Sequence, residues 1–494
     1  METSADNPTA ASAGLKRNVL DLRHAIVMAV AVMAPAAAIF FNTIPQAGLV
    51  GAAIPLCYVV GFVVSILVAN QFSEMAKELP ASGSFYTFVA QGLGPRMGFM
   101  TGWLTLISYG IVSPFAFVIF GASLHDLVQR WTGMDISWIF WFVLGTGIVF
   151  ALCYLGIKQS LQVDLTFIAF EIGICLLLAI VVIIQVGRKG QLTATPFNPA
   201  SIPAGGSPFL GIVLAILSFL GFEAAATLGE ETKNPRKSIP KAVFGSMITV
   251  GIFYIIMSYV ATVGYGVNNM AKYATDAAPF DTISRQYLGN VFVSLVDIAG
   301  ILSLYALGVA ITNGASRIIF AIGREGLFPA WVGKTHPTRK TPVNAVLVLC
   351  IITLVVGIWL GLALTPIGAY GFLGTLDTLA VLVIYALVNL ACFRFFWTKR
   401  RERFNWFRHA LIPLVSTASL IAVFVGTVYP PGAPPLNYTP YIVIIWAIIG
   451  IGVLLYLLRT KPAEVSRAGS VLATGESEEI TAEKGNPPGF DTAI

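Results

Sequence analysis

The stretch SFLGFEAAATLGEETKNP, residues 218–235, interrupts an apolar segment with a glycine and a carboxylate. The apolar run stops at Gly221, Glu223 follows, and three alanines resume the run before Gly229 and two further glutamates. Glycine makes it easy for the backbone to leave helical geometry. In a membrane, open backbone is tolerated only where it lines a cavity or is buried in protein. We therefore predict that a helix breaks here and that Glu223 lies where the backbone opens.

The composition indicates a membrane protein. Of 494 residues, 56% are hydrophobic and only 11% are charged, whereas soluble domains carry about 25% charged residues. Apolar stretches of about 20 residues, long enough to cross a hydrocarbon core of about 30 Å as helices, recur from end to end. A β-barrel would show alternating segments of about ten residues instead. We predict an all-α polytopic membrane protein. The twelve predicted transmembrane helices are 24–46, 49–72, 98–124, 137–156, 162–187, 208–229, 242–266, 291–322, 342–360, 366–396, 410–429 and 439–458.

The positions of the basic residues predict the orientation of the chain. With the N-terminus placed inside, all but five of the 30 Lys and Arg residues fall on the inner side. Because cytoplasmic loops carry such an excess of basic residues, we predict cytoplasmic termini in a multi-pass protein of the cell membrane. The basic runs are explained by topology and require no nucleic-acid partner. The five exceptions are Arg130, Arg188, Lys189, Lys272 and Arg285.

The chain divides into a transmembrane domain at 24–460 and two tails. The cytoplasmic tails at 1–23 and 461–494 are predicted from their polar and small residues, and the second is expected to be disordered. No cleavable signal peptide is expected, because no A-x-A site follows a short apolar stretch near the N-terminus. The cysteines show no C-x-x-C spacing, which predicts neither a disulfide nor a metal site. They are Cys57, Cys153, Cys175, Cys350 and Cys392.

A second interruption lies in VAVMAPAAAIFF, residues 30–41. Pro35 removes a backbone hydrogen bond inside a span, and three alanines follow it, as three alanines follow Glu223. Interrupted helices at corresponding positions of two halves indicate an inverted-repeat transporter whose substrate site lies at the breaks. A plain kink without a ligand is the alternative for each. The predicted repeats are about 24–187 and 208–396, with two additional helices at about 410–458.

Three long motifs resemble one family. They are FSEMAKELPASGSFYTFVAQGLGPRMGFMTGW at 72–103, FLGFEAAATLGEETKNPRKSIPKAV at 219–243 and NGASRIIFAIGREGLFPAWVGKTHPTRKTP at 313–342. Together they look like the amino acid–polyamine–organocation superfamily of permeases, and they also resemble bacterial putrescine importers within it. The resemblance implies the inverted five-helix repeat of sodium-coupled neurotransmitter transporters. It also agrees with an inner gate held by ion pairs at EETKNPRKSIP, for which a solvated loop is the alternative.

The chain departs from this family in two places. Many relatives carry a Gly-rich G-x-G-I-F in the first broken helix, where this chain has Ala34 to Ala38 followed by Ile39 and Phe40. The extra Cβ atoms reduce the room for a substrate carboxylate at the backbone N–H groups. Several proton-coupled relatives place a lysine in the fifth span at the position where this chain has Glu171.

We single out four acidic residues inside predicted spans, because an ionisable residue in the membrane is a functional-site hypothesis by default. Glu223 is predicted to bind substrate or carry a coupling proton, and Glu171 is a second coupling candidate. Asp297 and Asp377 are expected near span ends, where they would be hydrated. The aromatic candidates Tyr109, Phe219, Phe222 and Tyr305 offer ring faces to a cationic amine, or, as the alternative, they only pack against lipid or the protein core. The predicted substrate-binding set is Ala34, Pro35, Ala36, Ala37, Ala38, Tyr109, Phe219, Gly221, Phe222, Glu223 and Tyr305.

These features predict a secondary transporter. The sequence has no G-x-x-x-x-G-K-[ST] for ATP, no H-E-x-x-H and no G-x-S-x-G, and it shows no ring of charges typical of a channel filter. We predict no catalytic residues, no cofactor and no metal. The predicted activity is proton-coupled import of an amino acid, with a putrescine-type polyamine or another organic amine as the alternative. The coupling ion, import or exchange, and the oligomeric state stay open at this level.

Overall fold

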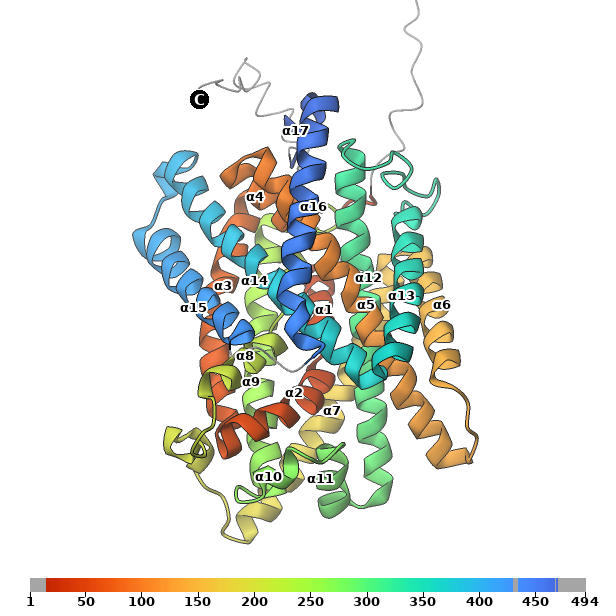
Figure 1. Cartoon of the computed structure of the whole chain (residues 1–494), viewed down its shortest axis with the longest axis vertical. Coiled ribbons are helices and arrows are strands. Elements are labelled where there is room, and N and C mark those ends of the chain that lie inside the picture. Colours follow the sequence, from red (N-terminus) through yellow and green to blue (C-terminus); the bar gives the residue numbers. More distant parts are fainter. Residues whose placement is uncertain (1–14, 430–433, 467, 470–494) are drawn as a thin grey trace, which may run out of the picture.

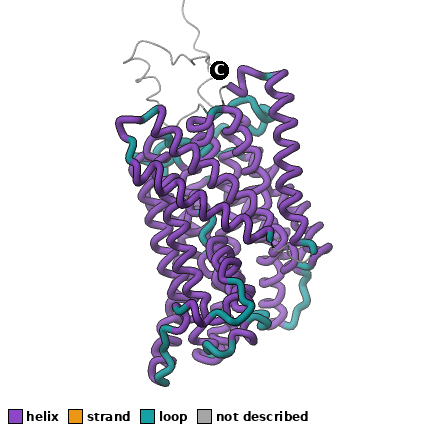
Figure 2. Tube along the Cα trace, turned by 60° about the vertical axis from the view of Figure 1, so that its left-hand side comes forward, coloured by secondary structure: helices purple, strands orange, loops and turns teal. Residues whose placement is uncertain are grey.

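The computed structural model describes residues 15–429, 434–466 and 468–469. Within these ranges the ordered elements are helices, joined by loops (Figures 1 and 2). The long helices are α1 (Leu22–Met33), α2 (Pro35–Val50), α3 (Ile54–Glu78), α5 (Pro95–Thr132), α6 (Trp138–Leu155), α7 (Ile157–Arg188), α8 (Pro208–Ser218), α9 (Pro235–Tyr265), α12 (Asn290–Arg324), α13 (Val343–Leu364), α14 (Pro366–Thr398), α15 (Ile412–Val428) and α16 (Thr439–Thr460). The short ones are α4 (Phe85–Leu93), α10 (Met270–Tyr273), α11 (Pro279–Leu288), α17 (Pro462–Ser466) and the 3-10 segment η4 (Phe222–Leu228).

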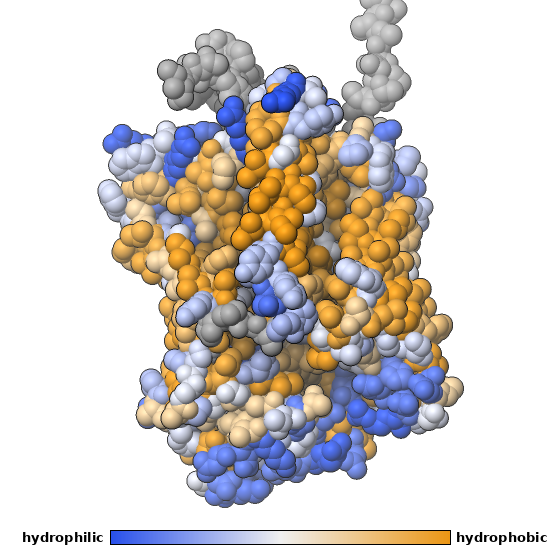
Figure 3. All heavy atoms as spheres, in the orientation of Figure 1, coloured by the Kyte–Doolittle hydropathy of each residue, from blue (hydrophilic) through white to orange (hydrophobic). Residues whose placement is uncertain are grey.

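The helices account for twelve membrane crossings in the described residues. Eleven segments are long and apolar enough to span a bilayer, and the first of them, Leu22–Glu78, contains two crossings, α1–α2 and α3. Hydrophobic residues cover the middle of the molecule and hydrophilic residues gather at both ends (Figure 3). The prediction of an all-α polytopic membrane protein is therefore confirmed.

Equivalent helices of the two halves make equivalent contacts. Helix α1 packs on α9 as α8 packs on α3, and α7 packs on α12 as α14 packs on α5. These pairs are equivalent if the interrupted helix α1–α2 begins one five-helix half and the interrupted helix α8–η4 begins the other. Helices α15 and α16 follow the second half. Helices α5 and α12, which hold equivalent positions, also contact each other and form much of the core. These contacts are the ones expected of two five-helix halves, and the repeat boundaries stay a prediction.

Two ends of the molecule are distinguished below. The α17 end carries α4 and α17, and the α10 end carries α10 and α11 (Figure 1). The sequence analysis missed α10 and α11, which lie in the connection after α9. The tail from residue 461 was expected to be disordered, but it begins with the helix α17. Pro462 suits the first turn of a helix. Lys461 Nζ donates to the Gly326 carbonyl at 2.9 Å. Predictions for 1–14, 467 and 470–494 lie outside the described residues.

Candidate functional site

The first helix break lies at Ala34, between α1 and α2. Ala34 has φ 46° and ψ 67°, a left-handed conformation that is uncommon for a residue with a side chain. Its N–H still donates to Val30 and Ala31, which ends α1. Pro35 then starts α2 at the position where a missing N–H costs nothing. The predicted interruption is therefore present, one residue before the proline.

The second break lies between α8, which ends at Ser218, and η4, which starts at Phe222. Gly221 has φ 114°, and a Cβ there would come within 2.9 Å of the Val32 carbonyl carbon on α1. Glycine is needed both for this conformation and for the close approach of the two broken helices. Glu223 follows inside η4. The predicted break and the position of Glu223 beside it are confirmed.

Glu223 is buried at the second break, with 1% of its surface exposed. Its Oε1 accepts a hydrogen bond from the Tyr109 hydroxyl of α5 at 3.0 Å, and its Oε2 accepts from the Tyr385 hydroxyl of α14 at 2.5 Å. The Gly221 N–H also donates to Oε2 at 3.0 Å. Three donors from separate elements hold this carboxyl at the place where the two halves meet.

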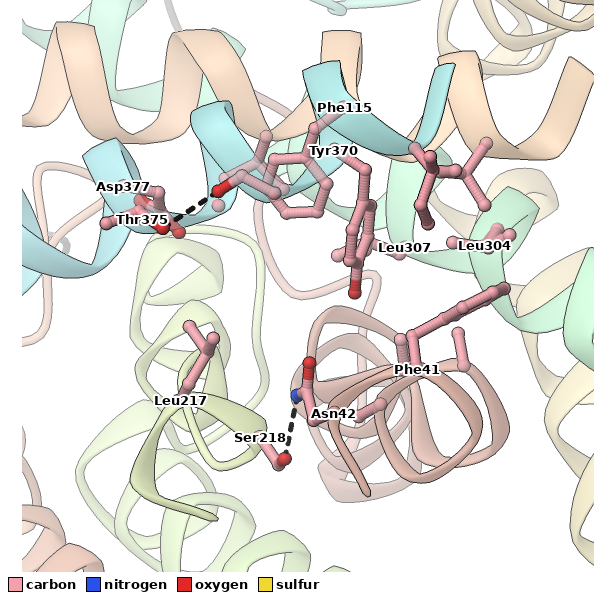
Figure 4. Close-up of a pocket in the computed structure, with 18 of the residues that line it drawn as sticks. Phe41, Asn42, Phe115, Leu217, Ser218, Leu304, Leu307, Tyr370, Thr375 and Asp377 are labelled. Atoms are coloured by element: carbon pink, nitrogen blue, oxygen red, sulfur yellow. Dashed lines mark hydrogen bonds between the residues drawn. The ribbon is translucent and has the colours of Figure 1, made fainter. Parts of the chain in front are cut away.

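A cavity of about 900 Å³ lies between the two breaks and α5, α12 and α14 (Figure 4). Its walls are mostly apolar, and three rings face one another there: Tyr370 lies 5.6 Å from Phe41 and 5.3 Å from Phe115, centroid to centroid. Asn42 donates to the Ser218 hydroxyl at 2.9 Å and so links the broken helices. The polar lining is sparse, as in most small-molecule sites.

The cavity reaches the surface at the α10 end. Its wall includes Thr275 and Ala277, which follow α10, and Thr365 before α14, all of them exposed. Toward the α17 end its wall is formed by buried groups, among them Glu223 and Asp377. The cavity is therefore open on one side of the molecule and closed on the other.

All charged side chains that line the cavity are acidic. Asp126 and Asp276 lie toward the mouth, and Glu223 and Asp377 lie at the closed end, with no Lys, Arg or His among the lining residues. Asp377 was expected near a hydrated span end, and that is wrong. It is the twelfth residue of α14, is 6% exposed, and accepts from the Ser108 hydroxyl at 2.6 Å. The site therefore attracts cations.

The first N–H groups of α2 already have partners inside the protein. Pro35 has no N–H; the Ala36 N–H donates to Glu171 Oε2 at 3.4 Å, and the Ala37 N–H donates to the Ser303 hydroxyl at 3.2 Å. Glu171 of α7 is thus brought to the first break, although it does not line the cavity. A substrate carboxylate has no free N–H at this helix start without displacing Glu171 or Ser303.

The predicted set divides into residues that line the cavity and residues that pack behind it. Ala34, Ala37, Ala38, Tyr109, Gly221 and Glu223 line it, whereas Pro35 and Ala36 do not. Phe219 packs on Tyr254, with ring centroids 5.2 Å apart. The other two aromatic candidates also pack behind the wall: Phe222 on Phe72 and Tyr385, and Tyr305 on Phe117, Phe120 and Phe167.

The sequence analysis missed most side chains of the wall, including Phe41, Asn42, Phe115, Ser218 and Tyr370. The rings carry no distinguishing sequence signal in a chain that is 12% aromatic. Asn42 did offer one, because an amide inside an apolar span needs a polar partner.

Two ion pairs close the molecule on the α17 side of the cavity. Glu231 pairs with Arg317 of α12, both almost fully buried, and Glu230 pairs with Arg324 at 2.9 Å. Ser82 donates its hydroxyl to Glu230 at 2.6 Å. Burial would raise the pKa of Glu230, but the bonds from Arg324 and Ser82 hold it below its usual value. The alternative of a solvated loop is therefore excluded for these two glutamates, which we call the gate acids.

The chain before α1 is joined to the gate acids through its backbone. The N–H groups of Val19 and Leu20 donate to the Glu231 carbonyl at 2.9 and 3.0 Å, and the Lys233 N–H donates to the Leu20 carbonyl at 2.8 Å. Asp21 follows and caps α1. Residues 19–20 thus form part of the closed side.

A charged cluster lies at the α10 end, outside the cavity wall. Asp297 of α12 accepts from Arg130 at 2.7 Å, and Asp281 of α11 lies 3.7 Å from the same guanidinium. Burial and the neighbouring Asp297 carboxylate raise the pKa of Asp281 to about 7. Asp297 is eight residues into its helix and partly exposed, as expected for a position near a span end.

Among the described residues, no group of three His, Cys, Asp or Glu side chains could hold a metal ion. The five cysteines are free and buried. The arrangement offers a cavity with the Glu223 carboxylate at the second break, and the Glu171 carboxylate lies behind the wall at the first.

Comparison with known proteins gives a consistent set of relatives. The sequence profile named amino acid permease matches residues 24–467. The branched-chain amino acid permease BcaP of Bacillus subtilis is 28% identical over 71% of this chain and 75% of its own length. The low-affinity putrescine importer PlaP of Escherichia coli is 24% identical over 83% and 88%. The methylthioribose transporter of B. subtilis is 25% identical over 83% and 86%. All three are transporters, and none is an enzyme.

Proposed function

Because this chain belongs to the amino acid permease family, and is thus a membrane transporter of amino acids or amines, we propose that it imports an organic amine by alternating access. The observation that carries the proposal is the cavity, which joins two helix breaks, opens at one end only and has exclusively acidic charged residues in its wall. Glu223 at the second break is the proposed partner of the substrate ammonium group.

Alternating access needs a site that is open to one side and closed to the other by contacts that can break. The cavity opens at the α10 end, and the pairs Glu231–Arg317 and Glu230–Arg324 close the α17 end. The excess of basic residues in the loops at the α17 end supports a cytoplasmic position for that end. We therefore propose a cell-membrane protein with cytoplasmic termini, described here in its outward-open state.

Two substrate classes follow from different observations. The apolar wall and the similarity to branched-chain permeases favour an apolar amino acid. The second candidate is a diamine such as putrescine, favoured by the occupied N–H groups of Ala36 and Ala37 and by the two buried acids Glu223 and Asp377. The first class requires a carboxylate contact elsewhere in the cavity; the second requires none.

We also propose proton coupling. A nearby positive charge favours the ionised carboxyl, so Glu223 pairs with the substrate ammonium group in its ionised form, and Glu171 is the proposed carrier of the proton that enters with the substrate. Glu171 lies at the first break and bonds to the start of α2, so its charge state can affect how that break is held. Both carboxyls are fully buried, as a site shielded from water on the closed side requires.

Three probes test the substrate class in proteoliposomes: leucine, isopentylamine, which is leucine without its carboxylate, and putrescine. An amino acid carrier exchanges leucine and rejects isopentylamine, whereas a diamine carrier exchanges putrescine and rejects leucine. Glu223→Gln should weaken exchange in either case, while Asp135→Asn, the same change at an exposed position, should not. No exchange of amines or amino acids by folded protein would refute the proposed function.

A further inference from the structure

Asp164 on α7 is a buried carboxylate that lies outside the cavity. None of its surface is exposed, and neither Oδ1 nor Oδ2 has a hydrogen-bond partner in the described part of the chain. Burying a polar group without a partner is costly, and more so when it is charged. An acidic residue retained in a transmembrane helix without a structural partner points to a functional role.

Asp164 shares a helix face with Ser160 and Glu171. Residues four and seven positions apart return to one face of an α-helix, and seven residues correspond to about 10 Å along the axis. Helix α7 packs on α12 along this face, since Asn313 of α12 donates to the Ser160 hydroxyl at 3.0 Å. Asp164 therefore lies on the gate side of Glu171.

Tyr305 of α12 lies at the level between the two carboxyls. Its ring packs on Phe167, with centroids 5.8 Å apart, and Phe167 comes three residues after Asp164 and four before Glu171. The Tyr305 hydroxyl is buried and has no hydrogen-bond partner among the described residues. Glu171 Oε1 also lacks a partner, so in this state the Tyr305 hydroxyl is not hydrogen-bonded to either carboxyl.

A polar chain begins at Ser160, one helical turn before Asp164, and leads to the gate acids. Ser160 bonds to Asn313, the Asn313 carbonyl accepts from Arg317 Nη1 at 2.8 Å, and Arg317 pairs with Glu231. This ion pair therefore lies on the gate side of Asp164.

No basic side chain pairs with Asp164 in the described residues, and α1 and α2 have no ionisable side chain from Ala25 to Val50. Helix α11 meets only the far end of α7, where Gln185 donates to the Tyr287 carbonyl. The ionisable groups that interact with Asp164 or Glu171 are Cys153 on α6, Cys175 on α7, Tyr254 on α9 and Tyr305 on α12.

We propose that Asp164 is a second proton-binding site, which receives the coupling proton from Glu171 through Tyr305 and releases it to water when the gate opens. This rests on the proposed proton-coupled function. The transfer takes place when movement of α7 against α12 brings the three groups within hydrogen-bond distance: the protonated Glu171 carboxyl then gives its proton to the Tyr305 oxygen, which gives its own O–H proton to the Asp164 carboxylate. One O–H bond breaks and one forms in each transfer, and no electrons are exchanged.

The test uses the full chain in proteoliposomes that contain a pH-sensitive dye, with labelled leucine and, in parallel, putrescine. Asp164→Asn should keep counterflow exchange within twofold of the parent and lose at least tenfold of its pH-driven accumulation and proton entry. Tyr305→Phe keeps the ring packing and removes only the unpartnered hydroxyl, so it should fold and show the same split. Asp135→Asn, an exposed change of the same kind, should behave as the parent.

Each outcome bears on a different step. Parent-like accumulation and proton entry in Asp164→Asn would overturn the second site. If that variant does not fold, parent-like pH-driven uptake in Tyr305→Phe overturns the path. Equal loss of counterflow and accumulation assigns these residues a structural role and also overturns the proposal. A parent protein that exchanges substrate without moving protons refutes the coupling itself, while a parent without exchange refutes the proposed function.

Discussion

Breaking the buried ion pair Glu231–Arg317 should open the closed side of the cavity. Arg317→Met removes the guanidinium and keeps a long apolar side chain. Glu231, which is only 2% exposed, then loses its charged partner. Breaking a buried pair in this way costs about 3–5 kcal/mol. The open state hydrates Glu231 and so relieves this cost, and each 1.4 kcal/mol corresponds to about a factor of ten. The closed-to-open ratio should therefore fall by about 10²–10³.

A single cysteine placed behind the gate measures this change. Thr227 is fully buried on η4, between Glu223 and the gate acids, so Thr227→Cys reports access from the α17 end once the five native cysteines are replaced by alanine. An impermeant maleimide is added to vesicles with that face outward. Labelling should be about 10²–10³ times faster with Arg317→Met, up to the rate of an exposed cysteine.

Two controls separate the charge effect from general loosening. The double variant Glu231→Gln with Arg317→Met removes both charges and should return labelling toward the parent rate, because replacing a whole buried pair is often nearly neutral. Arg324→Met breaks the more exposed pair with Glu230 and should accelerate labelling by less than about tenfold. Equal labelling of the parent and Arg317→Met would refute the role of this pair as a gate.

Four further outcomes are expected. Glu223→Gln should lose uptake driven by a pH gradient or show weakened affinity; parent transport and pH response would exclude it as substrate or proton site. Ala37→Leu, which fills the cavity wall beside the first break, should abolish uptake at near-normal expression. Engineered cysteines in 190–205 should react from outside and those in 232–240 only from inside. Since the folded-state pKa of Asp281 is raised to about 7, its contribution to stability is present at low pH and is lost between about pH 4 and 7. Asp281→Asn should flatten the thermal stability over that range.

The broken helices could be predicted because their cause is local. Pro35 and Gly221 limit the backbone by their own chemistry, so the interruptions were readable from the sequence. The left-handed conformation of Ala34 was not predicted, although helices usually end at or before the residue that precedes a proline.

The cavity wall was less predictable because it depends on tertiary contacts. Glu223 was identified since a carboxylate in an apolar span is rare. Asp377 has the same chemistry but was misplaced, because distance along a predicted span does not show which face of α14 meets α5. Phe219 and Tyr305 are aromatic residues near the site in sequence, yet their rings turn away from the cavity. Asp164, inside the predicted span 162–187, was not among the candidates.

The backbone hydrogen bonds that join residues 19–20 to Glu231 and Lys233 couple the segment before α1 to the movement of the gate acids. Any movement that parts the gate acids from α12 must carry Leu20 along or break these bonds. A fluorophore at the exposed Lys16, paired with one on α17, would therefore follow opening and closing in single molecules during turnover. For the same reason, a bulky fusion partner joined directly before Leu15 should slow the cycle, whereas one joined through a long flexible linker should not.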